Sequence, residues 1–406
     1  MSLGLVLLVV AISLGCIMAR PFGVKEAWPA LAGAVLLVGL GALSPRAALA
    51  AMGQGAQVYL FLIGMMLLAE LAVLEGVFDW AAAHLARWAG GSALLLFTLV
   101  YALAVVITAL LSNDATAVVF TPAVAAMAGA AGARDKLPYL LICAFVANAA
   151  SFLLPISNPA NLVLFDGQMP RLGAWLHLFG LASVLAILAS YATLWLTQRA
   201  HLRETLQVPD ESVTLGTGGR WTLAGLGVAA LLLVAAAAFG WALGTLTFLL
   251  GAGCLVLVSL LTRTPPWQAL RGVSWSVLPL VAGLFVMVAA LDQAGLVRVL
   301  SGFAQVGIGP VGAGLGLLSN LANNLPVGLL AAHLFAQAPA GAKAAALIGV
   351  DLGPNLSVTG SLATILWLNA LRREGMEMSA WRFLVLGAVM MPPALALALL
   401  GLWVSL

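Results

Sequence analysis

Apolar residues follow one another in long runs, separated by short polar stretches, along the whole chain of 406 residues. A helix needs about 17 to 25 mostly apolar residues to cross the hydrocarbon core of a bilayer. Many of the runs are close to this length, and two are too long for one crossing. The pattern predicts an all-α integral membrane protein. The runs lie at 3–19, 28–43, 58–74, 91–128, 139–165, 174–197, 221–239, 243–261, 276–292, 310–338, 343–370 and 380–404.

Composition supports this prediction. Hydrophobic residues make up 63% of the chain and charged residues only 8%, whereas an ordinary soluble domain carries about 25% charged residues. The first run, SLGLVLLVVAISLGC, is as apolar as a signal peptide, but no basic residue precedes it and no clear small-x-small cleavage site ends it. We therefore expect it to be the first membrane-spanning helix.

Motifs that would hold a metal, a nucleotide or another cofactor are missing from the sequence. Cys16, Cys143 and Cys254 stand singly in three different runs, so they predict neither a disulfide nor a metal site. No GxxxxGK[ST] loop occurs, so ATP hydrolysis by that route is not expected. The net charge of +3 is ordinary for a membrane protein with basic loops. We expect no enzymatic activity, no cofactor and no nucleic-acid partner.

The two halves of the chain correspond to each other. Similar short segments recur about 200 to 220 residues apart, which is how an internal duplication appears in a sequence. We therefore expect a first repeat at 1–197 and a second at 221–406, joined by a polar linker at 198–220. The paired segments are AVLEG around Gly76 with LDQAG around Gly295, Ser112-Asn113 with Asn323-Asn324, and SNPANL from Ser157 with TGSLAT from Thr359.

Each half is expected to contain about five spanning helices, one re-entrant helical hairpin and one broken helix. The hairpins would be 91–128 and 310–338, and the broken helices 139–165 and 343–370. With this topology, 13 of the 17 Lys and Arg residues fall on the side of the linker. Because basic residues favour the cytoplasmic side, we expect a cytoplasmic linker and both termini outside. The odd number of crossings would invert the second repeat, as in many secondary transporters.

Polar residues inside the apolar runs concentrate in four stretches, two in each half. Proline removes a backbone donor and clashes with the preceding turn, while Asn and Ser favour turns and caps over helix interiors. Each stretch therefore predicts a helix break, and such breaks at membrane depth are tolerated where they line a cavity or are buried in protein. We expect one polar pocket between the halves. The stretches are LLSNDATAVVFTP (110–122), PISNPAN (155–161), SNLANNLP (319–326) and DLGPNLSVTGS (351–361).

A single Asn in a span usually bonds one helix to another. Four breaks at corresponding positions, two of them with an aspartate, favour a functional site instead, because an ionisable residue inside a span is costly. Asp114 and Asp351 are the candidate proton-coupling residues, and Glu70 is a third acidic candidate. The candidate substrate-binding residues are Asn113, Thr116, Ser157, Asn158, Asn161, Asn320, Asn323, Asn324, Thr359 and Ser361.

The charges of the four stretches restrict the substrate. Two aspartates would repel an anion, and no Lys or Arg lies within the stretches to compensate. The nearest basic residues, such as Arg134 and Lys343, occupy loop-like positions in the sequence. A carboxyl group at membrane depth can exchange a proton or stay ionised beside a cation. The sequence therefore favours a neutral or cationic substrate.

The same stretches resemble the arsenite efflux permeases, the ArsB-type arsenical-pump membrane proteins of the ion transporter superfamily. The resemblance covers essentially the whole chain, and the DLGP…GSLATxLW block is specific to that group, whereas SN-type hairpin tips also occur in dicarboxylate and sodium–proton carriers. Family members commonly have Lys after DLGP, where this chain has Asn355. The segments that carry the resemblance are LLSNDATAVVFTPAV, SFLLPISNPANLVLF, LSNLANNLP and IGVDLGPNLSVTGSLATILWL.

This resemblance implies export of arsenite, and of antimonite, across the bacterial inner membrane. The export would be driven by the proton gradient and by an elevator-like movement of the hairpin-bearing bundle. It also admits a cytosolic arsenite-stimulated ATPase as an optional partner. Arsenous acid, As(OH)3, is a small neutral polyhydroxyl that amides and hydroxyls can bind by donating and accepting together. In this hypothesis Asn113, Asn158, Asn323 and Asn324 hold As(OH)3, while Asp114 or Asp351 takes the proton.

Two alternatives belong to other functional classes or use other ions. A sodium–proton antiporter or a sodium-coupled carrier would share the same architecture. An intramembrane aspartyl protease would also place two aspartates at membrane depth, but such enzymes pair YD with GxGD, and here the contexts are NDA and GVDLG. The GAGLG segment (312–316) fits the close-packing pattern of membrane helices and is compatible with a homodimer.

Overall fold

The computed structural model describes residues 2–165, 167–208 and 213–406. Residues 1 and 166 of the predicted first repeat, and residues 209–212 of the predicted linker, lie outside this part of the chain. All regular secondary structure within the described residues is helical, apart from one isolated bridge between Ser92 and Thr205. The all-α prediction is confirmed.

The α-helices follow a similar order in the two halves of the chain, although the short turns η2 and η5 stand at different places in that order. The first half contains α1 (Leu3–Ala19), α2 (Ala27–Gly39), α3 (Pro45–Gln54), α4 (Ala56–Leu74), α5 (Val77–Trp88), α6 (Ala93–Leu110), the π-helical turn η2 (Ala115–Phe120), α7 (Thr121–Ala130), α8 (Leu137–Ala149), α9 (Pro159–Phe165) and α10 (Leu172–Gln198). The second half contains α11 (Thr217–Phe239), α12 (Leu243–Thr262), α13 (Trp267–Gly272), α14 (Val277–Gln293), α15 (Leu296–Leu300), α16 (Ile308–Ala322), α17 (Asn324–Leu334), α18 (Ala340–Leu352), the 3-10 turn η5 (Gly353–Asn355), α19 (Leu362–Arg373) and α20 (Ala380–Ser405).

Several helices have the length and the apolar character of membrane spans. Within the described residues these are α4, α6, α10, α11, α12 and α20. A seventh is obtained if α14 and the segment that follows it, Leu296–Gln305, form one span bent by 70°. The other apolar runs form shorter helices, and several of these adjoin the helix breaks. The chain is therefore a multi-pass membrane protein.

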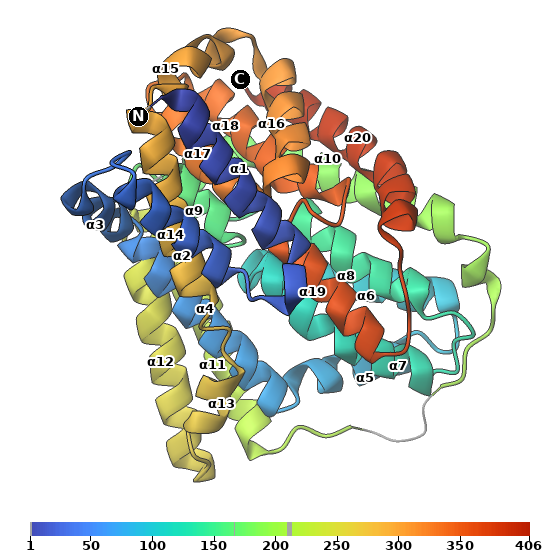
Figure 1. Cartoon of the computed structure of the whole chain (residues 1–406). Coiled ribbons are helices and arrows are strands. Elements are labelled where there is room, and N and C mark those ends of the chain that lie inside the picture. Colours follow the sequence, from blue (N-terminus) through green and yellow to red (C-terminus); the bar gives the residue numbers. More distant parts are fainter. Residues whose placement is uncertain (1, 166, 209–212) are drawn as a thin grey trace.

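Helices from the two halves pack against each other. α4 packs along α12, α2 along α14, and α10 along α20. Figure 1 shows α2, α4, α12 and α14 on one side of the molecule and α6, α7, α8 and α19 on the other. Buried apolar side chains follow the same division, with one cluster on each of these two groups and a third around α10, α18 and α20. The N- and C-termini lie at the same end of the molecule (Figure 1).

Glycines allow two of the helix pairs to approach until their backbones touch. A Cβ atom at Gly251 of α12 would overlap the backbone of Gly64 in α4. In the same way, a Cβ atom at Gly349 of α18 would overlap the backbone of Gly312 in α16. The GAGLG segment therefore packs within the chain, and it gives no support to the homodimer that its pattern suggested.

Replacing Gly251 with alanine is expected to destabilise the protein. The added methyl group has no space against the Gly64 backbone, and overpacking of this kind typically costs about 1–3 kcal/mol. Gly253, on the same helix, faces open space, so Gly253→Ala should be neutral or stabilising by up to about 1 kcal/mol. Thermal unfolding of the purified variants in detergent would measure both effects, and equal melting temperatures would contradict the proposed contact.

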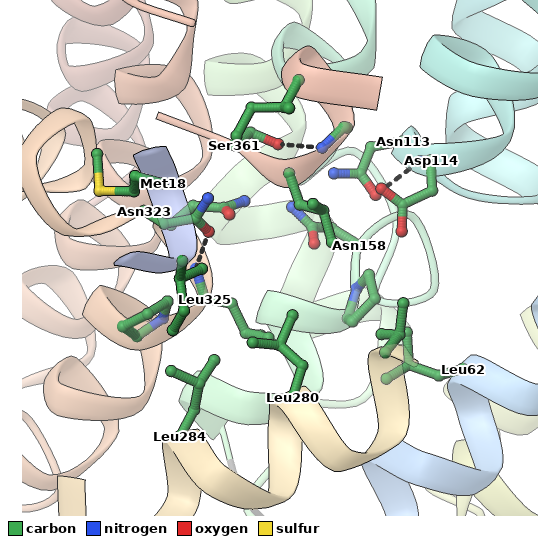
Figure 2. Close-up of a pocket in the computed structure, with 18 residues that line it drawn as sticks. Met18, Leu62, Asn113, Asp114, Asn158, Leu280, Leu284, Asn323, Leu325 and Ser361 are labelled. Carbon is green, nitrogen blue, oxygen red and sulfur yellow. Dashed lines mark hydrogen bonds between the residues drawn. The ribbon is translucent and has the colours of Figure 1, made fainter. Parts of the chain in front are cut away.

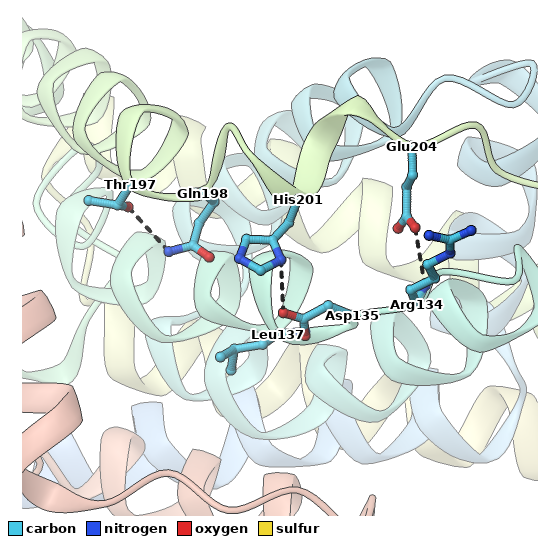
Figure 3. A network of polar contacts seen from close by, with 7 residues as sticks. All are labelled: Arg134, Asp135, Leu137, Thr197, Gln198, His201 and Glu204. Carbon is cyan, nitrogen blue, oxygen red and sulfur yellow. Dashed lines mark hydrogen bonds and ion pairs between the residues drawn. The ribbon is translucent and has the colours of Figure 1, made fainter.

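The first part of the polar linker is held against the bundle. The N–H of Leu206 donates to the carbonyl of Gly91 at 2.8 Å, and the Leu206 side chain is buried. Figure 3 shows His201 beside Asp135, with Nδ1 and Oδ2 3.3 Å apart. The segment expected to be a simple linker is therefore packed on the α7–α8 loop up to residue 207.

Candidate substrate cavity at four helix breaks

The two breaks of the first half are built by side chains that cap the helix that follows. After α6, Ser112 accepts a hydrogen bond from the N–H of Ala115 (3.1 Å), and Asn113 accepts one from the N–H of Asp114 (3.0 Å). After α8, Asn158 accepts one from the N–H of Ala160 (3.0 Å). Polar side chains that replace missing backbone partners are typical of helix starts. The breaks therefore lie where the sequence predicts them.

The second half uses the same device. Asn323 separates α16 from α17 with a φ of 69° and a ψ of 150°, a strained backbone conformation that is rare for any residue but glycine. Its side-chain oxygen accepts a hydrogen bond from the N–H of Leu325 (3.3 Å). Ser361 accepts one from the N–H of Ala363 (3.1 Å) and begins α19. These caps bring the starts of α17 and α19 to the same region as the first-half breaks.

Matching hydrogen bonds connect the two breaks within each half. In each half, a backbone N–H of the first break donates to a carbonyl in the second break, and a hydroxyl from that second break donates back to a carbonyl near the end of the helix that precedes the first break. The bonds are Asn113 N to Ser157 O (3.0 Å) and Ser157 Oγ to Ala109 O (3.0 Å) in the first half, and Asn324 N to Gly360 O (2.9 Å) and Thr359 Oγ1 to Asn320 O (2.9 Å) in the second.

The four breaks meet around one cavity of about 730 Å³, a volume that includes its open mouth. Figure 2 shows Asn113, Asp114, Asn158, Asn323 and Ser361 directed into the same space. The polar side chains that line the cavity are Asn113, Asp114, Asn158, Asn323, Asn324 and Ser361.

Apolar residues complete the wall opposite the breaks. Met18 comes from α1, Leu62 from α4, and Leu280 and Leu284 from α14 (Figure 2). These residues could not be identified from the sequence, because an apolar residue that faces a cavity has the same local pattern as one that faces lipid or another helix. The cavity therefore lies between the four breaks and the helices α1, α4 and α14.

Five of the predicted substrate-binding residues do not line this cavity. Thr116 bonds to Thr108 (2.7 Å) inside the first hairpin. Ser157 and Thr359 form the bonds between breaks described above. The Asn161 amide donates to carbonyl groups of its own break, and the Asn320 amide donates to Gly316 and Gly353. Their side chains hold the breaks in shape.

The two candidate proton-coupling residues have different surroundings. Asp114 lines the cavity and also a second, neighbouring cavity, where Glu70 of α4 is the other acidic residue. Its carboxylate has no hydrogen-bond partner among the residues that the structure describes. Asp114 is thus accessible from two cavities, and no metal-holding group of His, Cys, Asp and Glu residues forms around it in the described chain.

Asp351 is fully buried and does not line either cavity. Its carboxylate accepts hydrogen bonds from the Ser151 hydroxyl (2.7 Å) and from the Asn158 amide (2.9 Å). Asn355, which stands where the arsenite permeases commonly have Lys, bonds to the Asn148 amide at 2.9 Å instead. All these bonds join the second half to the first. Asp351 therefore reaches the cavity only through Asn158.

Lys343 differs from its expected position. It lies in the first turn of α18, is 8% exposed, and its ammonium group is 4.9 Å from the centre of the Phe165 ring. The expectation of a loop-like position was wrong, because the helix starts at Ala340. Arg134 does lie in an exposed loop, between α7 and α8.

Comparisons with known proteins agree on a class of transporters. Residues 6–350 match the family model described as citrate transporter. The chain is 29% identical to the arsenical pump membrane protein of Escherichia coli (strain K12), over 94% of both chains. It is 30% identical to the protein of the same name from Yersinia enterocolitica, over 84% of both chains. An uncharacterised transporter of Mycobacterium tuberculosis (strain ATCC 25618 / H37Rv) is 29% identical over 85% of both chains.

A solved structure has a similar fold. The YdaH transporter of Alcanivorax borkumensis superposes with a TM-score of 0.56 and is 17% identical, covering 88% of this chain and 87% of its own. At this level of identity the likeness concerns the fold alone. A transporter of known structure therefore has a similar fold.

Proposed function

This chain belongs to the citrate transporter family of membrane transporters, with the arsenical pump membrane proteins among its relatives, and from this premise we propose that it is an exporter of arsenite. The cargo is As(OH)3, and antimonite is a second substrate. Export is coupled to the entry of protons. The cavity between the four breaks is the binding site for the cargo.

The observation that carries this proposal is the polar lining of the cavity. It is made of carboxamides, one hydroxyl and one carboxylate, and no Lys, Arg or His is among the described residues that line it. A citrate ion, with three carboxylates, would require basic partners, since buried charges are stable only when paired. A small neutral polyhydroxyl needs none. The cavity therefore fits As(OH)3 better than the substrate named in the family's description.

Asp114 is the residue that we assign to proton coupling. It is the only carboxylate on the cavity wall within the described residues, and it also faces the second cavity that contains Glu70. A proton that enters from the Glu70 side reaches Asp114 without crossing the cargo site. Asp351 takes a supporting role, because its carboxylate is buried away from both cavities.

The architecture that we propose consists of two inverted repeats that work as an elevator. The similar order of the α-helices and the matching bonds of the breaks support a repeat, and transporters of this kind bind cargo where broken helices of two inverted repeats meet. The bundle that carries the breaks would move against α2, α4, α12 and α14. In the bacterial inner membrane the linker would be cytoplasmic and both termini outside, as the distribution of basic residues favours.

Uptake of arsenite into everted membrane vesicles tests the proposed function. Vesicles from cells that lack other arsenite exporters should accumulate arsenite when respiration energises them, in sodium-free buffer and without ATP. A protonophore should abolish the accumulation. Transport that requires sodium and ignores arsenite would select the sodium-coupled alternative and refute this proposal. Export that required an added cytosolic ATPase would refute the proposed proton coupling but not the proposed cargo.

A further inference from the structure

The orientation of three cavity carboxamides is fixed by the backbone. A backbone N–H can donate only to the oxygen of an amide side chain and not to its nitrogen. The oxygens of Asn113, Asn158 and Asn323 each accept such a bond, at 3.0, 3.0 and 3.3 Å. One of the two lone pairs of each oxygen is therefore engaged with the backbone, and the nitrogen is the atom turned toward a ligand.

The donors that remain are numerous. Within the described residues, the Nδ2 groups of Asn113 and Asn323 have no acceptor in the protein, so each offers two N–H donors. Asn158 gives one N–H to Asp351 and retains one. The three residues are 2%, 3% and 7% exposed in chain order, so the cavity is the place where these donors can be satisfied. Ser361, whose oxygen caps α19, adds an O–H donor.

Acceptors on the same wall are few. The Asp114 carboxylate is one. The Asn324 side chain, 7% exposed and without a hydrogen-bond partner among the described residues, can turn either its oxygen or its nitrogen toward the cavity. A hard cation such as Na⁺ is bound by several oxygen atoms, and on this wall three of the amide oxygens each already accept a backbone hydrogen bond.

We infer that this cavity recognises its cargo by donating hydrogen bonds from Asn113, Asn158, Asn323 and Ser361 to the cargo's oxygen atoms, while Asp114 accepts a hydrogen bond from one O–H group. The ligand class is a small, oxygen-rich solute with at least one hydroxyl. A bare cation, which requires several oxygen ligands, is disfavoured at this position. The inference rests on the proposed function and adds to it the atoms through which the cargo is held.

Replacing Asn113 or Asn323 with aspartate tests the role of the amide nitrogen separately from that of the amide oxygen. Aspartate keeps the oxygen that caps the helix and replaces the donor by a second acceptor. Serine provides a neutral variant, because it also caps helices well but lacks the amide. We expect each of the four variants to bind arsenite at least about tenfold more weakly, the scale of losing hydrogen bonds at a buried site. Asn113→Ser, which adds no charge and has no positive φ to maintain, should keep a melting temperature close to wild type. Asn369→Asp, on α19 and outside the cavity lining, is the matched control and should bind normally.

The experiment is a titration of the purified protein with arsenite and, separately, with Na⁺. Binding is measured by calorimetry and by thermal shift. Wild-type protein that binds arsenite, together with variants that bind it equally well, would overturn the inference and leave the proposed function intact. Wild-type protein that binds Na⁺ and not arsenite would overturn both. Weaker arsenite binding in the aspartate and serine variants, with an unchanged melting temperature for Asn113→Ser, is the supporting result.

Discussion

Replacing Asp114 with asparagine is expected to abolish proton-driven arsenite uptake into everted vesicles, while the protein stays inserted and folded. The carboxylate faces two cavities, one of which contains Glu70, and asparagine cannot exchange a proton. The stability should change little, since the carboxylate makes no side-chain hydrogen bond within the described residues that the substitution would remove. The loss of uptake should be complete rather than partial, because coupling requires the titrating group itself.

Uptake rates measured at equal protein levels in the vesicle membrane would check this expectation. The control is Glu377→Gln, which removes an exposed carboxylate in the loop before α20 and should leave uptake unchanged. Arsenite binding to the purified Asp114→Asn protein separates coupling from recognition. Normal uptake by Asp114→Asn would exclude this residue as the proton carrier.

Replacing Asp351 with leucine is expected to prevent the accumulation of folded protein. The side chain is fully buried, and it accepts bonds from Ser151 and Asn158. Leucine would leave the Asn158 amide without this acceptor, and an unsatisfied buried donor costs about 1–3 kcal/mol, whereas the Ser151 hydroxyl can turn to the carbonyl of Asn148 at 2.8 Å. Both donors come from the first half, so the substitution also removes contacts between the halves. Asn158 would lose the partner that helps to hold its amide.

Size-exclusion profiles and melting temperatures in detergent would measure the effect. Asp351→Asn should be milder, because the amide oxygen can still accept one bond, so this variant should fold with a lower melting temperature and reduced transport. Asp351→Leu protein as stable as wild type would show that the network has no structural role. The two aspartates are thus distinguished by outcome: Asp114→Asn gives folded and inactive protein, and Asp351→Leu gives little folded protein.

Much of the architecture could be predicted from the sequence, because bilayers restrict what a helix can contain. Proline, Asn and Ser inside apolar runs signalled all four helix breaks, since few other features explain such residues at membrane depth. Their correspondence between halves led to the expectation of one shared pocket. Six predicted residues do line one cavity: Asn113, Asp114, Asn158, Asn323, Asn324 and Ser361.

The sequence could not predict which polar residues of a break face the cavity and which hold the backbone of the break. A polar residue in a break can face a ligand or hold the loop, and the sequence around Asn158 and Asn161 is the same in either case. The structure turns the first into the cavity and uses the second to bond to Ser151, Leu154 and Pro155. The bond between Asn148 and Asn355 also escapes sequence reasoning, because 207 residues separate the two partners.

The backbone hydrogen bonds that connect the two breaks within each half have a consequence for which side chains can change during evolution. Asn113 and Asn324 are held through their main-chain N–H groups, to Ser157 and Gly360. Only proline lacks this donor, so any other residue at these two positions can still form the main-chain hydrogen bond. Selection can therefore exchange the side chains that meet the solute without loosening the scaffold that carries them, and one backbone can serve relatives that handle different solutes.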